Sequence, residues 1–282
     1  MAKARLPGID APAAQQRAYE RAIRRMADAA WSHLRSSTLP AYDAAARDRG
    51  DDLSSAIRRS LASLAAKLRR AASRVERDAE RVGDETDRRH RAEFSARAKQ
   101  AIGVEVVTSE GFRGKVLDRW NRENADLIRS IAADAVPSIR DDLERAFASG
   151  ERAEVIAKRW RERGLPLKFG TIEGRAKVIA RDQIGRLNGQ LTQARQQALG
   201  ITEYVWRTSR DQRVRDAHAD RDGRRFRWST APADGHPGHP VQCRCVAEGV
   251  IDLDQIAASS AATSPSSSRA RATEPLAAGV SA

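Results

Sequence analysis

The sequence predicts an α+β protein: a helical amino-terminal region, a long lead-in helix, a small antiparallel sheet and a disordered carboxy-terminal tail. Aromatic residues make up only 5% of the 282 residues and charged residues 32%, so a core must be built mainly from Ala, Leu, Ile and Val, which suits packed helices. Apolar residues recur at helical spacing through most of the first 200 residues. Between residues 200 and 250 they instead fall in short segments separated by turn signals, as strands do.

The amino-terminal segment, residues 1 to 11, contains Pro7 and Gly8 and is expected to form a loose arm. A helix is predicted over 13–33, because apolar residues recur every three or four positions along it. Thr38-Leu-Pro40 is expected to break this helix. The stripe that the helix would bury consists of Tyr19, Ile23, Met26 and Ala30.

A second, longer helix is predicted to open at Asp51 or Asp52, where a carboxylate favours the positive amino-terminal end of a helix. Its apolar positions alternate in steps of four and three, which is typical of a coiled-coil seam and equally of an amphipathic helix in a bundle. These positions are Ile57, Leu61, Leu64, Leu68, Ala71, Val75 and, after a break at Asp78, Val82. Gly83 is expected to end the helix, although a charge-rich helix could resume to Gln100.

Shorter elements are predicted next. Residues 102–107 are β-branched and flanked by glycines, which indicates a short strand or a buried loop. Three helices should follow at 116–135, 139–148 and 152–163, because Pro137 and Gly150 interrupt the helical pattern. Short helices joined by tight turns favour a small bundle.

The lead-in helix is predicted over 172–199. The hydroxyl of Thr171 can cap its first turn, and Gly200 stands just past its end, where glycine is favoured. Gln183 and Asn188 fall on or beside its apolar stripe and would need hydrogen-bond partners if buried.

Two strands and a short helix are predicted after it. Residues 201–208 alternate as a half-buried strand does, and 224–228 form a second strand after the turn signal Asp222-Gly223. Between them Ser209 is expected to cap a helix over 211–219. A Pro/Gly loop, 232–240, then leads to the two cysteines and an apolar segment ending at Leu253.

Cysteine and histidine gather in this module of about fifty residues. Tetrahedral zinc takes four thiolate or imidazole ligands and stabilises small modules that have little core. The expected set is His218, His236, Cys243 and Cys245, with His239 competing for the place of His236. The alternative is that the cysteines fill the core and the histidines cap turns. A disulfide between the two cysteines is disfavoured, since same-face neighbours on a strand fit bridge geometry poorly.

Two further classes of function compete. The aromatic residues of the module could be stacking platforms for nucleic acid, or they could form its core. These residues are Tyr204, Trp206, Phe226 and Trp228. Burial of Trp206 and Trp228 would exclude the stacking platforms. An enzyme could use Ser209, Asp211 and His218, but Ser209 has a cap to make and lacks the strand-elbow context of a hydrolase nucleophile. A zinc hydrolase would also need an activating carboxylate, for which Asp222 or Glu248 could be nominated. We therefore predict a protein that is not an enzyme.

The formal charge is +13, with 44 arginines against 7 lysines spread along the chain, which favours weak, non-specific contact with DNA or another acidic surface. The amino terminus has no apolar segment like that of a secretory signal. No apolar run approaches the roughly twenty residues of a membrane helix. With only two cysteines, the chain is expected to assemble in a reducing cytoplasm.

Five segments together resemble the signature of phage minor head proteins of the Mu F type. These are residues 176–183 with Leu187-Asn-Gly-Gln190, then 204–218, 222–226, His236-Pro-Gly and Cys243-Arg-Cys245. The resemblance covers about residues 165 to 250, and in relatives cysteine often takes the place of His218. The motif residues are Arg181, Tyr204, Trp206, Thr208, Asp211, Arg213, Arg215, Asp222, Gly223, Phe226, Pro237 and Arg244.

The resemblance implies three parts: a helical assembly region (1–165), a Mu F-type head-morphogenesis domain (166–253) and a disordered tail (254–282). It implies a minor structural component of a tailed-phage or prophage head that acts in procapsid assembly, and in DNA packaging or delivery. Portal protein, procapsid and capsid components would be its partners, with packaged DNA contacted non-specifically and no membrane. The protein would be assembled in the bacterial host cytoplasm and lie in the head interior or at the portal vertex. The competing hypotheses are a nucleic-acid-binding zinc module and a zinc-dependent hydrolase.

Overall fold

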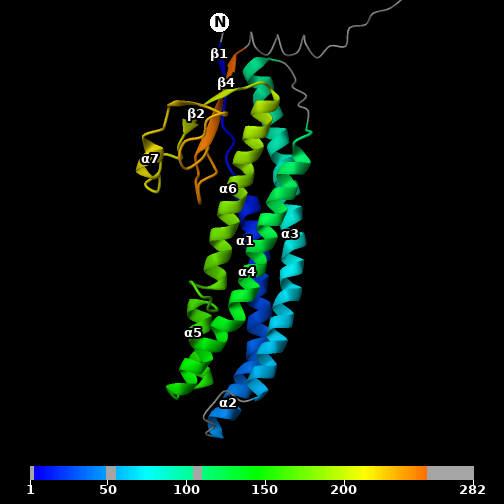
Figure 1. Ribbon diagram of the computed structural model, residues 1–282, viewed down its shortest axis with the longest axis vertical. Helices are drawn as coiled ribbons and strands as arrows, with labels where there is room; N and C mark the ends of the chain where they lie inside the picture. The colour runs from blue at the N-terminus through cyan, green and yellow to red at the C-terminus, as the bar shows by residue number, and fades with distance from the viewer. Residues whose placement is uncertain (1–2, 49–54, 104–109, 253–282) are drawn as a thin grey trace, which may run out of the picture.

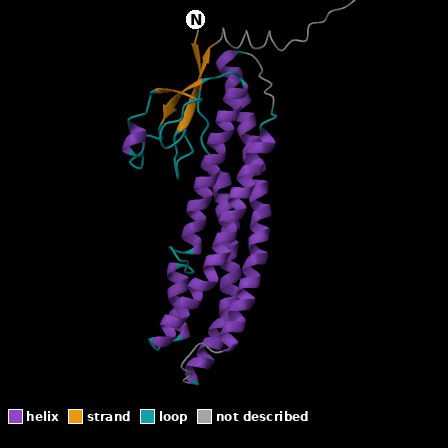
Figure 2. Ribbon diagram, viewed as in Figure 1, coloured by secondary structure: helices purple, strands orange, loops and turns teal. Residues whose placement is uncertain are grey.

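The computed structural model describes residues 3–48, 55–103 and 110–252. Long helices run side by side as an elongated bundle, and a small sheet with its loops lies against the side of one end (Figures 1 and 2). The sheet has four antiparallel strands in the order β1-β4-β2-β3. The predicted α+β class, helices first and a small antiparallel sheet after them, is confirmed. The expected tail, 254–282, lies outside the described residues, as do residues 104–109 of the predicted strand or loop.

The first helix, α1 (Ala13–His33), has the predicted bounds. The expected break at Thr38-Leu-Pro40 is wrong, because α1 continues through a π-helical turn, η1 (Leu34–Thr38), into α2 (Leu39–Arg47). Pro40 lies in the first turn of α2, where its missing N–H costs no helical hydrogen bond. The wider π-helical turn comes immediately before it, where a proline ring would crowd an α-helical backbone.

The second helix, α3 (Ser55–Ile102), passes through Asp78 and Gly83 without interruption, so the predicted break and stop are both wrong. Gly83 is instead a contact point. A Cβ built on it would lie 2.8 Å from Cζ3 of Trp120, which shows that α3 and α4 (Arg113–Ala148) pack closely here. The helix buries Ala72 rather than the predicted Ala71. Its stripe packs against α1 and α4 of the same chain, so it is an amphipathic bundle helix.

α4 is one helix, although Pro137 had indicated two. A proline inside a helix costs roughly 3 kcal/mol. Ala135 and Ile139 on either side of Pro137 are nevertheless fully buried in the bundle core, and their packing holds the helix together. α5 (Ala153–Arg163) follows Gly150, which has a positive φ of 68°, as the sequence predicts.

The lead-in helix, α6 (Ile172–Ala198), also matches its prediction. The hydroxyl of Thr171 accepts a hydrogen bond from the backbone of Gly174, and Gly200 follows the helix with a φ of 74°. Gln183 and Asn188 are both buried, and each has a hydrogen-bond partner, although Oδ1 of Asn188 has none among the described residues. The amide of Asn124 donates to Gln183, and Asn188 donates to the carbonyl of Ile9.

The sheet contains a strand that the sequence did not predict. β1 (Lys3–Leu6) belongs to the expected loose arm, yet it pairs with β4 (Val246–Asp252). The other strands are β2 (Glu203–Arg207) and β3 (Arg225–Arg227), within the predicted segments. Leu6 and Ile9 are buried in a cluster at the junction of bundle and sheet, which also holds Phe94, Ala98, Ile201 and Ile251.

The boundary near residue 165 divides elements that share a core. α6 packs against α1, α3 and α4, and its apolar residues join theirs in one cluster. The division into 1–165 and 166–253 remains a prediction about function, but packing joins the two parts. Among the helices of the described residues, none combines the length and apolar character needed to cross a bilayer.

Candidate metal centre

Three of the four predicted ligands meet behind the sheet. His218 lies on the short helix α7 (Asp216–Ala219), and Cys243 and Cys245 precede β4. α7 is shorter than predicted and Ser209 does not cap it. Asp211 instead accepts the backbone N–H of Arg213 and pairs with the guanidinium of Arg244, which holds the chain in a turn before the helix.

The spacing of the three ligand atoms suits a tetrahedral metal ion. Nδ1 of His218 lies 3.7 Å from Sγ of Cys243 and 3.5 Å from Sγ of Cys245. Zinc bonds of about 2.3 Å to sulfur and about 2.1 Å to nitrogen at tetrahedral angles would separate N and S by about 3.6 Å. All three side chains are buried. The group could therefore hold a metal ion.

The outer ring nitrogen of His218 is held by a carboxylate. Its Nε2 lies 2.8 Å from Oδ2 of Asp234, and Arg221 pairs with the other oxygen of this carboxylate. A proton on Nε2 leaves the lone pair of Nδ1 directed at the two sulfurs. A carboxylate that orients a ligating histidine in this way is the usual outer partner of a metal-bound imidazole.

The two thiols share a hydrogen bond that shifts their pKa values in opposite directions. The hydrogen bond from Cys245 is the largest cause that lowers the pKa of Cys243, to about 6, although burial opposes it. The pKa of Cys245 is correspondingly raised, by that hydrogen bond and by burial. The buried indole N–H of Trp206 has no nitrogen or oxygen acceptor among the described residues, and it favours the Cys245 thiolate. Cys243 is thus the thiol that loses its proton more readily, while Cys245 retains its own.

His236 is not part of this group. Its Nδ1 lies 2.8 Å from the hydroxyl of Tyr204, which donates to it, and the ring makes a second hydrogen bond with the backbone of Trp228. His239 packs edge-on against the His236 ring, 5.7 Å away, and is not in the group either. Both histidines belong to the aromatic core, and burial lowers the pKa of each.

The aromatic residues of the sheet are core. Trp206 and Tyr204 are fully buried and Trp228 nearly so, in one cluster with the two cysteines. The Trp206 ring lies edge-on to the His218 ring, with centroids 5.1 Å apart. The prediction that these rings could be stacking platforms for nucleic acid is therefore wrong, because bases cannot reach buried faces.

Several other motif residues have structural partners. Asp222 accepts the backbone N–H of Thr208, and Gly223 follows it with a φ of 78°. Phe226 stacks on Tyr204, with ring centroids 5.9 Å apart. The carbonyl of Pro237 lies 2.6 Å from where a Cβ of Gly189 would be, so only glycine lets the loop lie against α6.

Sequence reasoning missed three supporting residues. Asp234 orients His218, Asp182 accepts the backbone N–H of Gln242 beside the cysteines, and Gln196 bonds both Trp228 and the carbonyl of Ala247. Polar residues on the buried stripe of α6 were a usable signal for the last two. Nothing in the local pattern marks Asp234, because only the folded loop brings it to His218.

The candidate enzyme residues are occupied elsewhere. Both ring nitrogens of His218 face other groups, so neither is left to act as a base for Ser209. Glu248 pairs with Arg207 and Arg5, and Asp222 holds the backbone of Thr208. Both nominated carboxylates, Glu248 and Asp222, are therefore engaged in other contacts.

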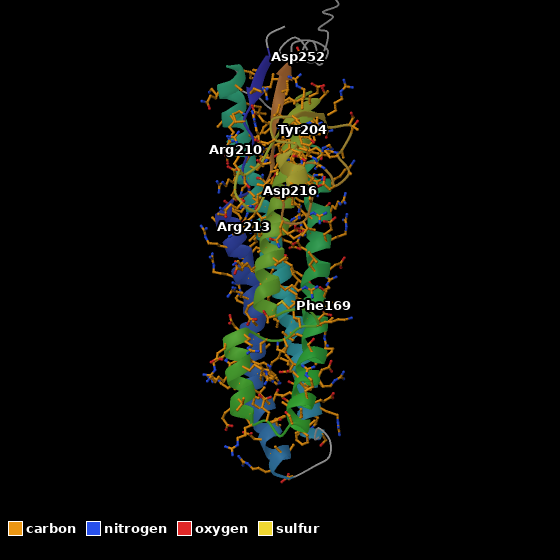
Figure 3. The ribbon with its side chains drawn as sticks, turned by 90° about the vertical axis from the view of Figure 1, so that its left-hand side faces the viewer. Phe169, Tyr204, Arg210, Arg213, Asp216 and Asp252 are labelled. Carbon is orange, nitrogen blue, oxygen red and sulfur yellow. The ribbon has the colours of Figure 1, made fainter. Side chains whose placement is uncertain are left out.

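Four of the motif arginines line a cavity of about 290 Å³. It lies beside His218, Cys243 and Cys245, the three residues that could hold a metal ion and are called the metal group below. Arg181 comes from α6, Arg213 and Arg215 precede α7, and Arg244 lies between the cysteines. Figure 3 faces this side of the molecule, and Arg213 lies there between the sheet and the lower bundle. His218, Cys243 and Cys245 form part of the wall.

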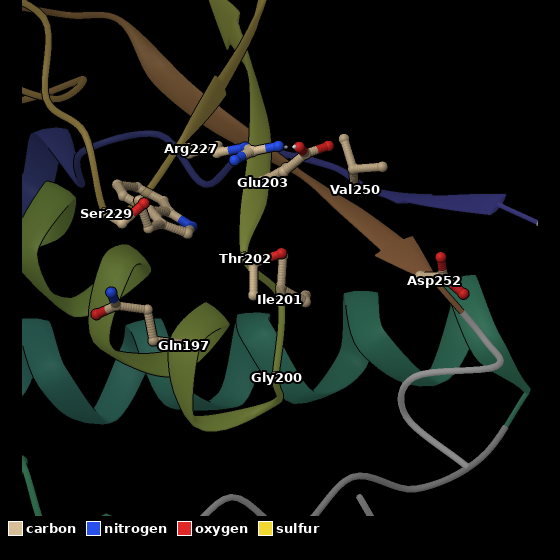
Figure 4. Close-up of a pocket in the computed structure, with 10 residues that line it drawn as sticks. Gln197, Gly200, Ile201, Thr202, Glu203, Arg227, Ser229, Val250 and Asp252 are labelled. Atoms are coloured by element: carbon tan, nitrogen blue, oxygen red, sulfur yellow. Dashed lines mark hydrogen bonds and ion pairs between the residues drawn. The ribbon is translucent and has the colours of Figure 1, made fainter. Parts of the chain in front are cut away.

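A wider cavity of about 610 Å³ lies between the end of α6 and the strands (Figure 4). Its charged residues are Glu203, Arg227 and Asp252, and Glu203 pairs with Arg227 across it. It has no histidine or cysteine in its lining, so it offers less chemistry than the metal group does.

Comparison with known proteins gives one family. Residues 137–248 match the family described as phage Mu protein F like protein, a longer span than the sequence motifs indicated. The chain is also 34% identical, over 173 residues or 60% of its length, to an uncharacterized protein of Haemophilus influenzae. It spans 38% of the length of that curated relative. No solved structure matches the chain.

Proposed function

Because residues 137–248 form a phage Mu protein F-like domain, we propose that the protein is a minor structural component of a tailed-phage or prophage head. It would act in head morphogenesis at the procapsid stage, in contact with the portal. The family match is the observation that carries this proposal. The matched span holds the last third of α4, all of α5 and α6, strands β2 and β3, and the metal group.

The architecture suits an assembly role. The bundle is long and its outer faces carry many ion pairs between exposed side chains, so it presents an extended polar surface to partners. Phe169, on the loop between α5 and α6, is 80% exposed. A rigid bundle with a sheet fixed to one end can act as a spacer between two binding partners.

We propose zinc as the ion at His218, Cys243 and Cys245, because two thiolates and one imidazole are ligands that zinc favours. The ion would have a structural role. It would join α7 to the segment before β4, in a module whose own apolar cluster is small.

The partners would be the portal protein and other procapsid or capsid components, and the location the head interior or the portal vertex. Packaged DNA would be a weak, non-specific partner, because the +13 charge is spread along the chain and can only neutralise phosphates. Assembly would take place in the bacterial host cytoplasm.

The proposal is tested by sedimentation of procapsids from the cognate phage, formed with and without portal protein in the presence of the tagged full chain. The chain should sediment with portal-containing shells and stay at the top of the gradient with portal-free shells. A chain that is folded by circular dichroism yet fails to sediment with either shell would overturn the head role. Equal sedimentation with both would exclude the portal as its partner.

A further inference from the structure

The cavity beside the metal group has an unbalanced charge. Its lining contains Arg181, Arg213, Arg215 and Arg244 but no carboxylate. Asp211 and Asp182 are neighbouring acids: Arg244 already pairs with both oxygens of Asp211, and Asp182 accepts the backbone N–H of Gln242. Four guanidinium groups therefore line a cavity of about 290 Å³ whose own lining holds no carboxylate.

Two of these arginines lack a fixed partner. Arg244 is paired with Asp211, and Arg215 donates to the carbonyl of Val241. Among the residues that the structure describes, Arg181 and Arg213 form no ion pair, although both line the cavity. Their guanidinium donors are available to a ligand.

Arg181 is placed under electrostatic stress. Burial is the largest cause that lowers its pKa, and the charges of Arg244 and Arg213 lower it further. Like charges gathered at a half-buried position repel one another unless an anion lies between them.

We propose that this cavity binds a phosphate group through the guanidinium groups of Arg181 and Arg213, with Arg215 and Arg244 on its rim. Guanidinium forks match the tetrahedral oxyanion and bind it through paired hydrogen bonds. The volume is at the small end for ligand cavities, which begin at roughly 300 Å³, and admits a phosphate group with few further atoms. The proposal does not depend on the role in the phage head.

The metal group does not supply the attraction. Two thiolates balance the charge of a divalent cation, so a loaded site is nearly neutral. The arginines alone give the cavity its positive field. Phosphate binding should therefore depend on the arginines.

The test is calorimetric titration of the full chain with inorganic phosphate at low chloride. Wild-type protein should bind in a saturable way to one site. R213A removes an exposed side chain that has no folding partner, and the R181A/R213A pair should weaken binding at least tenfold. R74A, which removes an exposed arginine of α3, is the matched control and should change the affinity less than twofold. Wild-type protein without saturable binding, or equal affinities for R213A and R74A, would overturn the proposal.

A second titration, with short duplex DNA, identifies the source of the phosphate. If inorganic phosphate displaces the DNA and R213A lowers DNA affinity more than R74A does, the cavity takes a backbone phosphate. If R213A loses phosphate binding while its DNA affinity equals that of R74A, the ligand is a small phosphate compound. Both outcomes retain the phosphate site and differ only in what brings the group to it.

Discussion

Ala4 of β1 and Ile251 of β4 are paired in antiparallel register, although they stand at opposite ends of the described chain. The pairing places Leu6 in the cluster formed by Phe94 of α3 and Ile251. The amino terminus is therefore part of the sheet that the carboxy-terminal motifs build, and it fastens that sheet to the bundle.

Truncation of Leu6 tests this fastening. Leu6→Ala should lower the free energy of unfolding by about 2–5 kcal/mol, since a buried leucine loses its contacts and leaves a cavity. Arg5→Ala, at an exposed position of the same strand, should change it by less than about 0.5 kcal/mol. Urea unfolding measures both. Equal stabilities would mean that β1 adds nothing to the fold.

Gly83 and Gly114 form a matched pair of helical glycines. Gly83→Ala should destabilise the protein by roughly 1–3 kcal/mol, because its Cβ would overlap the buried ring of Trp120. Gly114→Ala meets open space and should stabilise by up to about 1 kcal/mol through helix propensity. Thermal unfolding of the two variants separates close packing from propensity. A stabilising Gly83→Ala would show that α3 and α4 are further apart.

Arg195 is fully buried, and its Nη2 lies 2.6 Å from Oδ1 of Asp87. Arg195→Met should cost about 3–5 kcal/mol, because it leaves the buried carboxylate of Asp87 with fewer partners. Arg129→Met breaks the exposed pair with Glu76 and should cost far less, because solvent screens this pair. Chemical denaturation compares them. Similar losses would mean that the buried network contributes no more than a surface ion pair.

His90 should make stability fall in mild acid. Burial, with the charge of Arg195, holds its pKa well below 6.5, while the unfolded chain binds a proton at about that pH. Its Nδ1 accepts a hydrogen bond from Arg195, which can only donate, so protonation would break this contact. Stability is therefore present above pH 6.5 and lost as the pH falls below it.

His90→Gln should remove part of this loss. Between pH 7.5 and 5.5 the variant should lose roughly 1 kcal/mol less than wild type, since the folded state no longer resists a proton at this position. Denaturant titrations at the two pH values measure the difference. The hypothesis fails if both proteins lose the same free energy, because other groups would then account for the acid sensitivity.

Single substitutions test which residues bind the metal ion. Wild-type protein should carry close to one zinc per chain, and Cys243→Ser, Cys245→Ser and His218→Ala should each lose it. His236→Gln should keep the metal, because His236 binds Tyr204 and not the ion. Elemental analysis of unchelated protein decides. Metal-free wild type would exclude the centre, and loss in His236→Gln would restore that residue as a ligand.

A weaker effect is expected at Asp234. Asp234→Asn should lower metal affinity about 10–100-fold, because the neutral amide no longer holds the His218 imidazole in place. Competition with a chelator gives the ratio. Unchanged affinity would show that the histidine is oriented by packing against Trp206 alone.

Elements whose signals are local could be predicted from the sequence. Thr171 and Gly200 mark the ends of α6, because caps depend on neighbours along the chain. The strand expected around Tyr204 is β2, but it buries Tyr204, Val205 and Trp206 in succession, so it is not the half-buried strand that the alternation predicted. The crowding of cysteine and histidine between residues 218 and 245 likewise indicated a group that could hold a metal ion, and His218, Cys243 and Cys245 form such a group.

Other features depend on packing between segments that are far apart in the sequence, and local signals predict them wrongly. Pro137 and Gly83 look like helix ends, but burial of the flanking residues outweighs the cost of proline, and the glycine serves a contact with Trp120. β1 looks like a loose arm, because a strand of four residues gains stability only from a partner far away in the sequence. His236 and His218 are indistinguishable in composition. Only the fold sets one against Tyr204 and the other against two sulfurs, since ligand geometry depends on positions in space.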